Sequence, residues 1–393
     1  MKHICFVITN PNHHWDMIKP ILSELRKKSS ISFLVVSFCE FRRMKTPVED
    51  FKKLGITYQV MPGFANSGLK PSSGSWILGK TNSRIRKLAQ KTTWYLLLKK
   101  PFKKAMKKCS EIVVLNDAVF PGNYIAKEAR KNNLRLSLLQ EGIRFSLPNE
   151  INDNDIYGMN VDRIFTWGQM SKEYFTGRIQ NPGVEIIAAG CPRIDTKLRH
   201  YYKGNIKGLN SKTGNHKKSL VFFSNPIDDQ GYASETEKWN LIADFFEKGR
   251  PILEKYGIDS KVKLHPRENP DHLSKVLRRR ELSRNVKLIQ GEIFSVLKRA
   301  NYSIVLASTV GLESLLANVP LGVMSIPGFG FAFDYVREGA GIPLDVSCDD
   351  FHDRLTGLIN KSDIDIQQKN YIDCHFANQG NSAKVIANQL SER

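Results

Sequence analysis

Short apolar runs alternate with stretches of helical periodicity along most of the chain. The run at residues 4–8 has the length and the β-branched composition of a buried strand. Polar residues 9–12 break this strand, and apolar residues then recur at helical spacing across 15–27 before a second strand-like run at 31–37. A strand, a helix and a strand in this order predict a parallel sheet.

The alternation continues in two series that a polar segment separates. The first series holds further strand-like runs at 112–115, 134–139, 163–166 and 185–188. The second series holds strand-like runs at 220–223, 261–264, 286–289, 303–306 and 321–325. Between the two series, residues 199–218 are rich in Lys, Gly, Asn and Ser, a composition typical of a linker.

This organisation predicts an α/β protein of GT-B architecture, in which two Rossmann-like domains face a central cleft. A length of 393 residues accommodates two such domains. We expect the first domain at 1–198, the linker at 199–218, the second domain at 219–365, and a helical segment at 366–393 that packs back on the first domain. Parallel sheets of this kind bind ligands at the carboxyl ends of their strands, which here means the cleft.

The net charge of +20 predicts an anionic partner, which is a nucleic acid, an acidic lipid surface or a phosphorylated substrate. The chain lacks the helix-turn-helix, aromatic RNA-binding and zinc-finger patterns, which disfavours a nucleic acid. Six cysteines without a CxxC pair favour reduced thiols in the cytoplasm and no metal site. No run of 18 apolar residues predicts a transmembrane helix, and the first apolar run is too short for a signal peptide.

A candidate phosphate site follows two strands of the second domain. His265 and Pro266 follow the run at 261–264, and Ser308 and Thr309 stand where the run at 303–306 leads into a helix. Helix starts carry unpaired N–H groups and a partial positive charge, so they bind phosphate well. The alternatives are hydroxyls that only cap the helix and a histidine that only bonds to backbone.

Further residues of the second domain extend this prediction. Gly311 would let a phosphate approach closely, Glu313 would accept hydrogen bonds from ribose hydroxyls, and Ser224 ends another strand at the same edge. The alternative for Glu313 is an exposed position on the helix. The adjacent acids Asp228 and Asp229 have no third ligand near them in sequence, so we expect no metal there.

The first domain supplies a candidate general base. Glu141 follows the run at 134–139, and Gly142 gives the tight turn that would expose its carboxylate. A carboxylate in this position can deprotonate a hydroxyl group within hydrogen-bond reach. The alternative is an ion pair with Arg144.

His13 and His14 follow the first strand, and Asn116 follows the run at 112–115, so all three belong to the same sheet edge. We expect these residues and Arg144 to contact the second substrate, or acceptor. One of the histidines could instead be an alternative base, and a further alternative is that the histidines cap the helix or are solvated.

The segment from Arg84 to Lys108 combines ten Lys or Arg residues, no acidic residue, and several Leu and aromatic residues. Basic residues beside Trp and Leu suit an anionic membrane surface. We therefore expect peripheral binding at the inner face of the cytoplasmic membrane. The alternative is an ordinary amphipathic helix with a solvated face.

Three short motifs resemble those of bacterial sialyltransferases and polysialyltransferases, and of the similar capsular Kdo transferases. They are Gln140-Glu141-Gly142, Lys263-Leu264-His265-Pro266 and Ser308-Thr309. The resemblance implies a metal-independent enzyme with a CMP-activated donor, with His265 and the Ser308-Thr309 pair on the CMP phosphate and Glu141 as the base. Gln140 stands where an acidic residue is common in that family.

The resulting expectation is a glycosyltransferase that moves sialic acid, another nonulosonic acid or Kdo from CMP to a bacterial surface glycan or lipid-linked glycan. One alternative keeps the fold and uses a UDP-sugar or CDP-glycerol donor. A second alternative is an enzyme on the same fold that transfers nothing, such as an epimerase.

Overall fold

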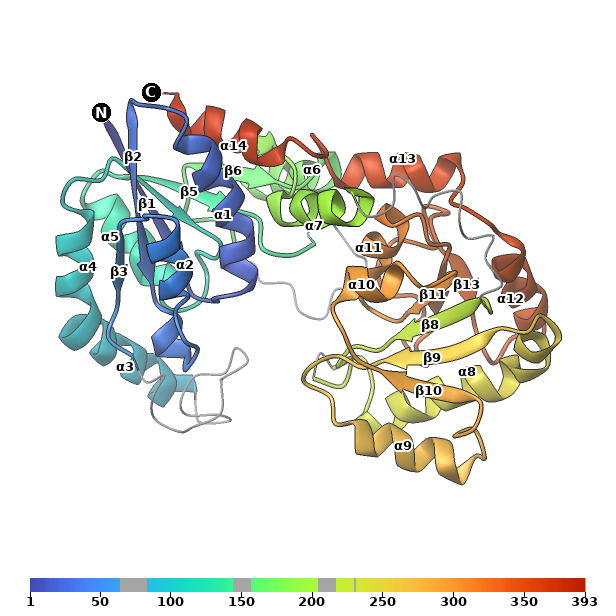
Figure 1. The fold of residues 1–393 in the computed structure, drawn as a ribbon. Helices are drawn as coiled ribbons and strands as arrows, with labels where there is room; N and C mark the ends of the chain where they lie inside the picture. The colour runs from blue at the N-terminus through green and yellow to red at the C-terminus, as the bar shows by residue number, and fades with distance from the viewer. Residues whose placement is uncertain (64–82, 144–156, 204–216, 230, 393) are drawn as a thin grey trace. The chain divides into compact units, whose positions relative to one another are not determined.

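The computed structural model describes residues 1–63, 83–143, 157–203, 217–229 and 231–392. The chain divides into two compact units (Figure 1). The described parts of Met1–Phe145, Asn154–Thr196 and His375–Arg393 form unit 1, and the described part of Lys197–Cys374 forms unit 2. The expected linker at 199–218 overlaps the end of a helix at Lys203, and its remainder up to residue 216 lies outside the described residues.

Unit 1 is built on a seven-stranded sheet whose strands are all parallel, in the order β3-β2-β1-β4-β5-β6-β7. The strands are β1 (Lys2–Ile8), β2 (Ile31–Ser37), β3 (Tyr58–Val60), β4 (Glu111–Val114), β5 (Arg135–Leu139), β6 (Arg163–Thr166) and β7 (Glu185–Ala188). The central strands are apolar and buried because helices flank the sheet on both faces (Figure 1).

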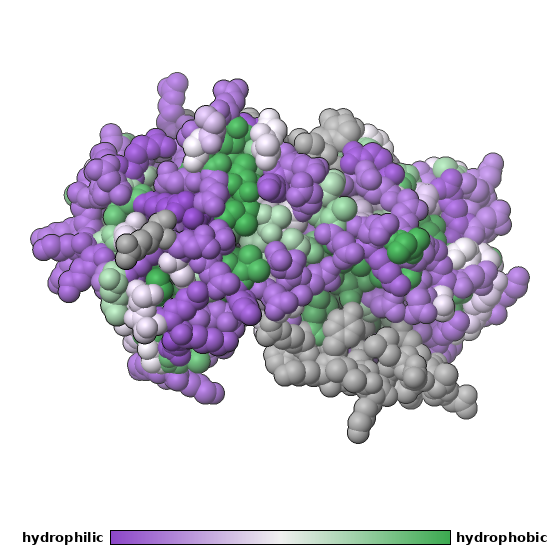
Figure 2. Space-filling view, turned by 90° about the horizontal axis from the view of Figure 1, so that it is seen from above, coloured by the Kyte–Doolittle hydropathy of each residue, from purple (hydrophilic) through white to green (hydrophobic). Residues whose placement is uncertain are grey.

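The helices of unit 1 follow the strands in the order that a parallel sheet requires. They are α1 (His13–Leu25), the 3₁₀ helix η1 (Cys39–Arg42), α2 (Val48–Lys53), α3 (Ser83–Thr93), the π-helix η2 (Trp94–Leu98), α4 (Lys99–Met106), α5 (Gly122–Lys131), α6 (Gln169–Arg178), α7 (Pro192–Lys203, which reaches into unit 2) and α14 (Ser382–Ser391). Hydrophilic side chains cover most of the molecular face in Figure 2, in keeping with the high net charge.

Unit 2 repeats the same principle with a six-stranded parallel sheet in the order β10-β9-β8-β11-β12-β13. The strands are β8 (Ser219–Phe223), β9 (Asp259–Lys263), β10 (Val286–Ile289), β11 (Tyr302–Val305), β12 (Leu321–Met324) and β13 (Ile342–Leu344). The helices are α8 (Glu235–Lys255), α9 (Pro270–Arg279), α10 (Ile293–Leu297), α11 (Val310–Leu316), α12 (Phe351–Asn360) and α13 (Ile366–His375).

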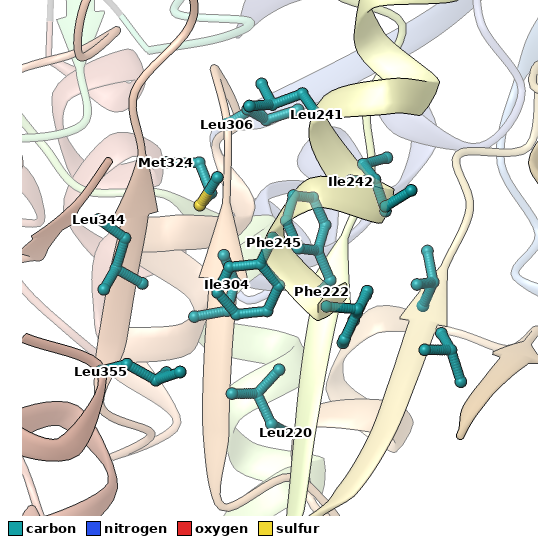
Figure 3. Close-up of a cluster of buried hydrophobic side chains, with 14 of the residues drawn as sticks. Leu220, Phe222, Leu241, Ile242, Phe245, Ile304, Leu306, Met324, Leu344 and Leu355 are labelled. Atoms are coloured by element: carbon teal, nitrogen blue, oxygen red, sulfur yellow. The ribbon is translucent and has the colours of Figure 1, made fainter. Parts of the chain in front are cut away.

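The core of unit 2 lies between one face of this sheet and the helices α8 and α12. Phe222 of β8 and Ile304 of β11 face Phe245 of α8, and Leu355 of α12 packs at the side (Figure 3). Each of these four side chains is fully buried. Burying a side chain of this size contributes about 1.5–3 kcal/mol, so this layer fixes the strand order that places the site.

Strand order decides which loops meet at the carboxyl edge of each sheet. In unit 1, β1, β4 and β5 are neighbours although about a hundred residues separate β1 from β4 in sequence. In unit 2, β9, β8 and β11 are neighbours. The loops that follow these strands therefore lie side by side, as the sequence predicts for a parallel sheet.

The C-terminal segment packs on unit 1, as expected from the sequence. The helix α14 lies along α1 (Figure 1), and the ring of Phe376 stacks on Trp167 with centroids 5.7 Å apart. The carboxylate of Asp195 accepts hydrogen bonds from the backbone N–H groups of Gly380 and Ser382, at 2.8 and 2.9 Å. These contacts hold the chain terminus against the sheet. In the described part of the chain, no helix has both the length and the apolar character to cross a membrane.

Gly190 is the tightest point of this attachment. Its φ is +96°, and an added Cβ would lie 2.1 Å from Ser382 Oγ and 2.3 Å from the carbonyl oxygen of Ala377. We expect Gly190→Ala to lower the free energy of unfolding by roughly 2–3 kcal/mol, measured by urea denaturation. The control is Gly55→Ala, which has φ +56° but nothing within 4 Å, and should lose only about 1 kcal/mol. Equal losses in the two variants would show that the C-terminal contact is not tight.

Candidate functional site

Three loops of unit 1 converge on the carboxylate of Glu141, which follows β5. Its Oε1 lies 3.0 Å from His14 Nε2, and its Oε2 accepts a hydrogen bond of 3.2 Å from Asn116 Nδ2. The backbone N–H of Glu141 donates to the hydroxyl of Tyr157 at 3.0 Å. The structure therefore brings together Glu141, His14 and Asn116, three residues that the sequence placed at one sheet edge.

The loop after β1 fixes both histidines in the first turn of α1. The side-chain oxygen of Asn10 accepts hydrogen bonds from the backbone N–H groups of Asn12 and His13 at 2.9 and 3.0 Å. This turn starts the helix and leaves the two rings beside Glu141.

The hydrogen bonds of His14 determine which ring nitrogen carries the proton. The backbone N–H of Thr9 donates to Nδ1 of His14 at 3.2 Å, so Nδ1 must have a free electron pair. The proton is then on Nε2, which donates it to the carboxylate of Glu141. His14 is nearly fully buried, so its neutral ring acts as a fixed donor to that carboxylate.

Hydrogen bonds from the backbone also fix the side chain of Asn116. Its Oδ1 accepts hydrogen bonds from the backbone N–H groups of Ala118 and Val119, both at 3.0 Å, which leaves its Nδ2 to donate to Glu141. Gly122 lets the chain fold closely over this loop, because a Cβ there would lie 1.9 Å from the carbonyl oxygen of Asn116. The amide is therefore positioned by backbone on both sides.

The side chain of His13 contacts the backbone of Glu141. Its Nε2 lies 2.8 Å from the carbonyl oxygen of Glu141, an acceptor, so Nε2 carries the proton. Burial, together with the charge of Arg193, lowers the pKa of His13 to about 4. His13 is therefore neutral at pH 7, and its Nδ1 has a free electron pair.

Glu141 stays ionised although its surroundings are partly desolvated. Burial alone would raise the pKa of its carboxyl group, but the hydrogen bonds from His14 and Asn116 outweigh burial and hold the pKa well below its usual range. The same cluster includes Arg42 of η1, which the sequence reading missed. Burial lowers the pKa of Arg42, and the negative charge of Glu141 opposes that shift. Arg42, His14 and Asn116 line one small cavity of unit 1.

In unit 2, His265 follows β9 in a loop whose conformation is fixed by hydrogen bonds from its own backbone N–H groups. The N–H of His265 donates to Glu268 Oε2 at 2.8 Å, and the N–H of Arg267 donates to Nδ1 of the His265 ring at 3.2 Å. The ring proton is therefore on Nε2. Burial, with the charges of Arg267 and Lys263, lowers the pKa of His265 to about 4. Pro266 is exposed beside it.

A buried ion-pair network supports this loop. The ammonium group of Lys238 lies 2.7 Å from Asp228 Oδ1 and 3.1 Å from Glu268 Oε1. The hydroxyl of Ser224 donates to the same Glu268 oxygen at 2.9 Å. Ser224 thus has a structural partner, and its contact with a phosphate stays a prediction. Sequence reading missed Lys238 and Glu268 because nothing in their local pattern marks them as buried.

The start of α11 combines the expected hydroxyls with an unexpected tyrosine. Ser308 Oγ accepts a hydrogen bond from the N–H of Val310 at 3.3 Å, while Thr309 is exposed. The hydroxyl of Tyr335 donates to the carbonyl of Ser308 at 2.9 Å and accepts from the N–H of Leu312 at 3.2 Å. A Cβ on Gly311 would lie 2.6 Å from the Tyr335 ring, so this glycine makes room for the tyrosine. The phosphate contacts of these residues stay predictions.

Glu313 is buried, with 3% of the residue exposed, so it is not a solvated helix position. Its charge, together with those of Glu292 and Glu268, counteracts the lowering of the Lys263 pKa that burial causes. Arg144 lies outside the described residues. Across the part of the chain that the structure describes, no cluster of three or more His, Cys, Asp or Glu residues could hold a metal ion.

No family model and no curated protein matches the chain. Solved structures resemble it over their whole length. UDP-GlcNAc 2-epimerase from Methanocaldococcus jannaschii is 15% identical with a TM-score of 0.62, and each chain is covered by 100%. The enzyme from Neisseria meningitidis bound to UDP-GlcNAc is 16% identical, with 99% of both chains covered and a TM-score of 0.62. Staphylococcus aureus MnaA with UDP is 15% identical, with 99% and 96% covered and a TM-score of 0.62.

These similarities confirm the α/β fold of two Rossmann-like units. They also correct the expected identity. The resemblance to sialyltransferases and Kdo transferases, and with it the transfer of an acidic sugar from a CMP-activated donor, is wrong: the similar structures include two UDP-GlcNAc 2-epimerases, one of them bound to UDP-GlcNAc, and MnaA with UDP. The three motifs led to the wrong donor because a glycine, a histidine and small hydroxyls at strand ends suit any nucleotide phosphate. They say little about which nucleobase the nucleotide carries.

The neutral His13 makes stability depend on pH. Its pKa is 6.5 in the unfolded chain and about 4 in the folded one, so between these values only the unfolded chain binds the proton. Its contribution, at most about 3 kcal/mol, is complete above pH 6.5 and is lost as the pH falls towards 4. We expect His13→Gln to reduce the slope of the free energy of unfolding against pH across this window, by the equivalent of at most one bound proton. Urea denaturation at each pH measures this free energy. Parallel pH profiles for the variant and the natural protein would contradict the assignment.

Proposed function

We propose that this chain binds a UDP-activated sugar and epimerises it at C2, the carbon next to the anomeric carbon. The observation that carries the proposal is the Glu141 carboxylate, held ionised by His14 and Asn116 at the strand ends of unit 1. Support for the nucleotide comes from the similar structures, which contain UDP or UDP-GlcNAc and match the chain over its full length.

The proposed role of unit 2 is to hold the nucleotide. Its β8, β9 and β11 loops bring Ser224, His265 and Ser308 to one sheet edge, where this type of sheet binds ligands. His265 offers a neutral ring with its proton on Nε2, which suits donation to a phosphate oxygen. Thr309 is exposed at the start of α11, where its hydroxyl is available to a ligand. Glu313 in the first turn of α11 is our candidate for the ribose hydroxyls.

The proposed role of unit 1 is proton transfer. Inversion at C2 breaks the C2–H bond and makes a new one on the opposite face, and it becomes feasible when the C1–oxygen bond to UDP breaks at the same time. The electron pair of the C2–H bond then forms a C1–C2 double bond, and UDP leaves with the electrons of its own bond. Return of UDP to C1 and of a proton to C2 completes the reaction without an external oxidant or reductant.

Glu141 and His13 are the two proton-transfer groups in this proposal. Glu141 is an ionised carboxylate, and His13 is a neutral ring with a free electron pair on Nδ1, so both are in the deprotonated form that a general base needs. A second acid–base group allows removal and return of the proton on different faces of the sugar. His14 and Asn116 act as positioning residues, since both bond to the Glu141 carboxylate.

A second candidate function is transfer of a sugar from UDP to an acceptor hydroxyl, with Glu141 as the base. Two of the similar structures favour it: a glycosyltransferase from Rickettsia africae, with a TM-score of 0.54, and Anabaena Alr3699/HepE in complex with UDP and glucose, with a TM-score of 0.50. The two functions differ in what happens without an acceptor. An epimerase exchanges the C2 hydrogen with solvent, whereas a transferase leaves it in place.

The epimerase proposal predicts deuterium incorporation at C2 when the protein is incubated with UDP-GlcNAc in heavy water, measured by NMR and mass spectrometry. Glu141→Gln keeps the size of the side chain and removes its charge, so we expect a loss of about 10²–10⁴-fold in exchange rate. The control is Glu173→Gln on the exposed surface of α6, which should exchange normally. No C2 exchange by the natural protein with any UDP-N-acetylhexosamine would refute epimerisation.

Nucleotide binding gives a separate prediction. We expect UDP to raise the melting temperature in a concentration-dependent way, and CMP to raise it much less. Replacing His265 by Ala should reduce the UDP effect, because the ring that would donate to phosphate is lost, while Glu141→Gln should retain it. A larger stabilisation by CMP than by UDP would contradict the proposed nucleotide.

A further inference from the structure

We propose that the segment from Arg84 to Lys108, here called the basic helical segment, docks unit 1 onto an anionic lipid bilayer. The segment comprises α3, η2 and α4, which continue one another along the chain and lead into β4. This inference does not depend on the proposed function, because Glu141, His265 and Ser308 lie outside the segment.

Large apolar side chains of the segment are exposed to solvent. Leu96 is 76% exposed, Leu88 65% and Ile85 56%, and these three residues recur at spacings of three and eight positions. Such spacings return to the same side of a helix. Tyr95 and Leu97 in η2 are exposed beside them. Half of the large exposed apolar side chains found in the described chain are scattered along the sequence, whereas these five form one group within thirteen residues.

The opposite side of the segment is anchored in unit 1. Trp94, Leu98 and Phe102 are buried completely or almost completely, and the Trp94 ring lies 5.7 Å from that of Phe102 and 5.4 Å from that of Tyr124. The exposed Leu96 and Leu97 therefore belong to η2, which Trp94 and Leu98 anchor in the core, and α3 with Leu88 leads directly into η2. An apolar face fixed in this way costs free energy in water unless something covers it.

The positive charge of the basic helical segment indicates which kind of partner covers its apolar face. The segment has ten Lys and Arg residues and no Asp or Glu, so it supplies half of the net charge of +20. Lys99 and Lys103 pair with Glu128 of α5, at 3.3 and 3.6 Å, and tie α4 to its neighbour (Figure 1). Other lysines of the segment are exposed: Lys87, Lys91, Lys100, Lys104, Lys107 and Lys108.

Aliphatic side chains beside a dense positive charge fit the boundary between lipid headgroups and acyl chains. The leucines would enter the acyl region, and the lysines would reach the headgroup phosphates while their methylene groups lie along the boundary. A nucleic acid would satisfy the lysines but would leave Leu88, Leu96 and Leu97 in water. The structure thus favours an anionic membrane surface over a nucleic acid as the partner of this segment.

The test is co-sedimentation of the full-length chain with vesicles of phosphatidylcholine, alone or mixed with phosphatidylglycerol. We expect binding to the mixed vesicles, little binding to phosphatidylcholine alone, and weakening as salt rises. Leu96→Gln should weaken binding at least tenfold, because it removes from the acyl region the most exposed apolar side chain of the segment. Lys100→Glu with Lys104→Glu should weaken it by about fivefold or more for each residue.

The matched control is Lys275→Glu with Arg279→Glu, two exposed positions on α9 of unit 2 that change the net charge by the same amount. The control should bind the mixed vesicles like the natural protein, and melting curves should show that all variants fold. Failure of the natural protein to bind anionic vesicles would refute the inference. It would also be refuted if the control lost as much binding as the segment variants, or if Leu96→Gln had no effect while oligonucleotides displaced the vesicles.

Discussion

The bond between the Glu141 carboxylate and the His14 ring is the interaction on which the site of unit 1 depends. It joins the ends of β1 and β5, and Asn116 at the end of β4 completes it from the strand between them. Removing a carboxylate from water is costly, and only donors placed before the ligand arrives can offset that cost. The sheet provides this placement, because three strands far apart in sequence are neighbours in space.

Unit 2 uses the same principle with a different charge. The buried ammonium group of Lys238 joins Asp228 to Glu268, and Glu268 in turn accepts from Ser224 and from the backbone N–H of His265. One buried cation therefore ties together the loops after β8 and β9. Buried ion pairs contribute little net stability, but the loss of one partner is costly. Such a network therefore specifies the conformation of the loops and adds little to the free energy of unfolding.

Sequence reasoning placed Glu141, His14, Asn116, His265 and Ser308 correctly at strand ends, because apolar runs mark parallel strands and the residue after each run must lie at the same edge. It missed Arg42, Lys238, Glu268 and Tyr335. Arg42, Lys238 and Tyr335 come from a 3₁₀ helix, a long helix and a distant turn, and only tertiary packing brings them to these loops. Glu268 belongs to the His265 loop itself, but nothing in its local sequence marks it as buried. The CMP-activated sugar donor was predicted wrongly for a related reason. Strand-end motifs indicate a phosphate site, which all nucleotides share, and they carry little information about the nucleobase.

The basic helical segment shows what structure adds to a pattern that is plain in sequence. Its charge is visible from composition, yet a run of lysines is compatible both with a solvated face and with a binding surface. The structure separates these cases by side-chain environment, because Lys99 and Lys103 pair with Glu128 while Leu88 and Leu96 are exposed to water. A solvated face needs only the charges. Exposed leucines leave apolar area in contact with water, and a lipid surface is the partner that removes this contact and uses the charges at the same time.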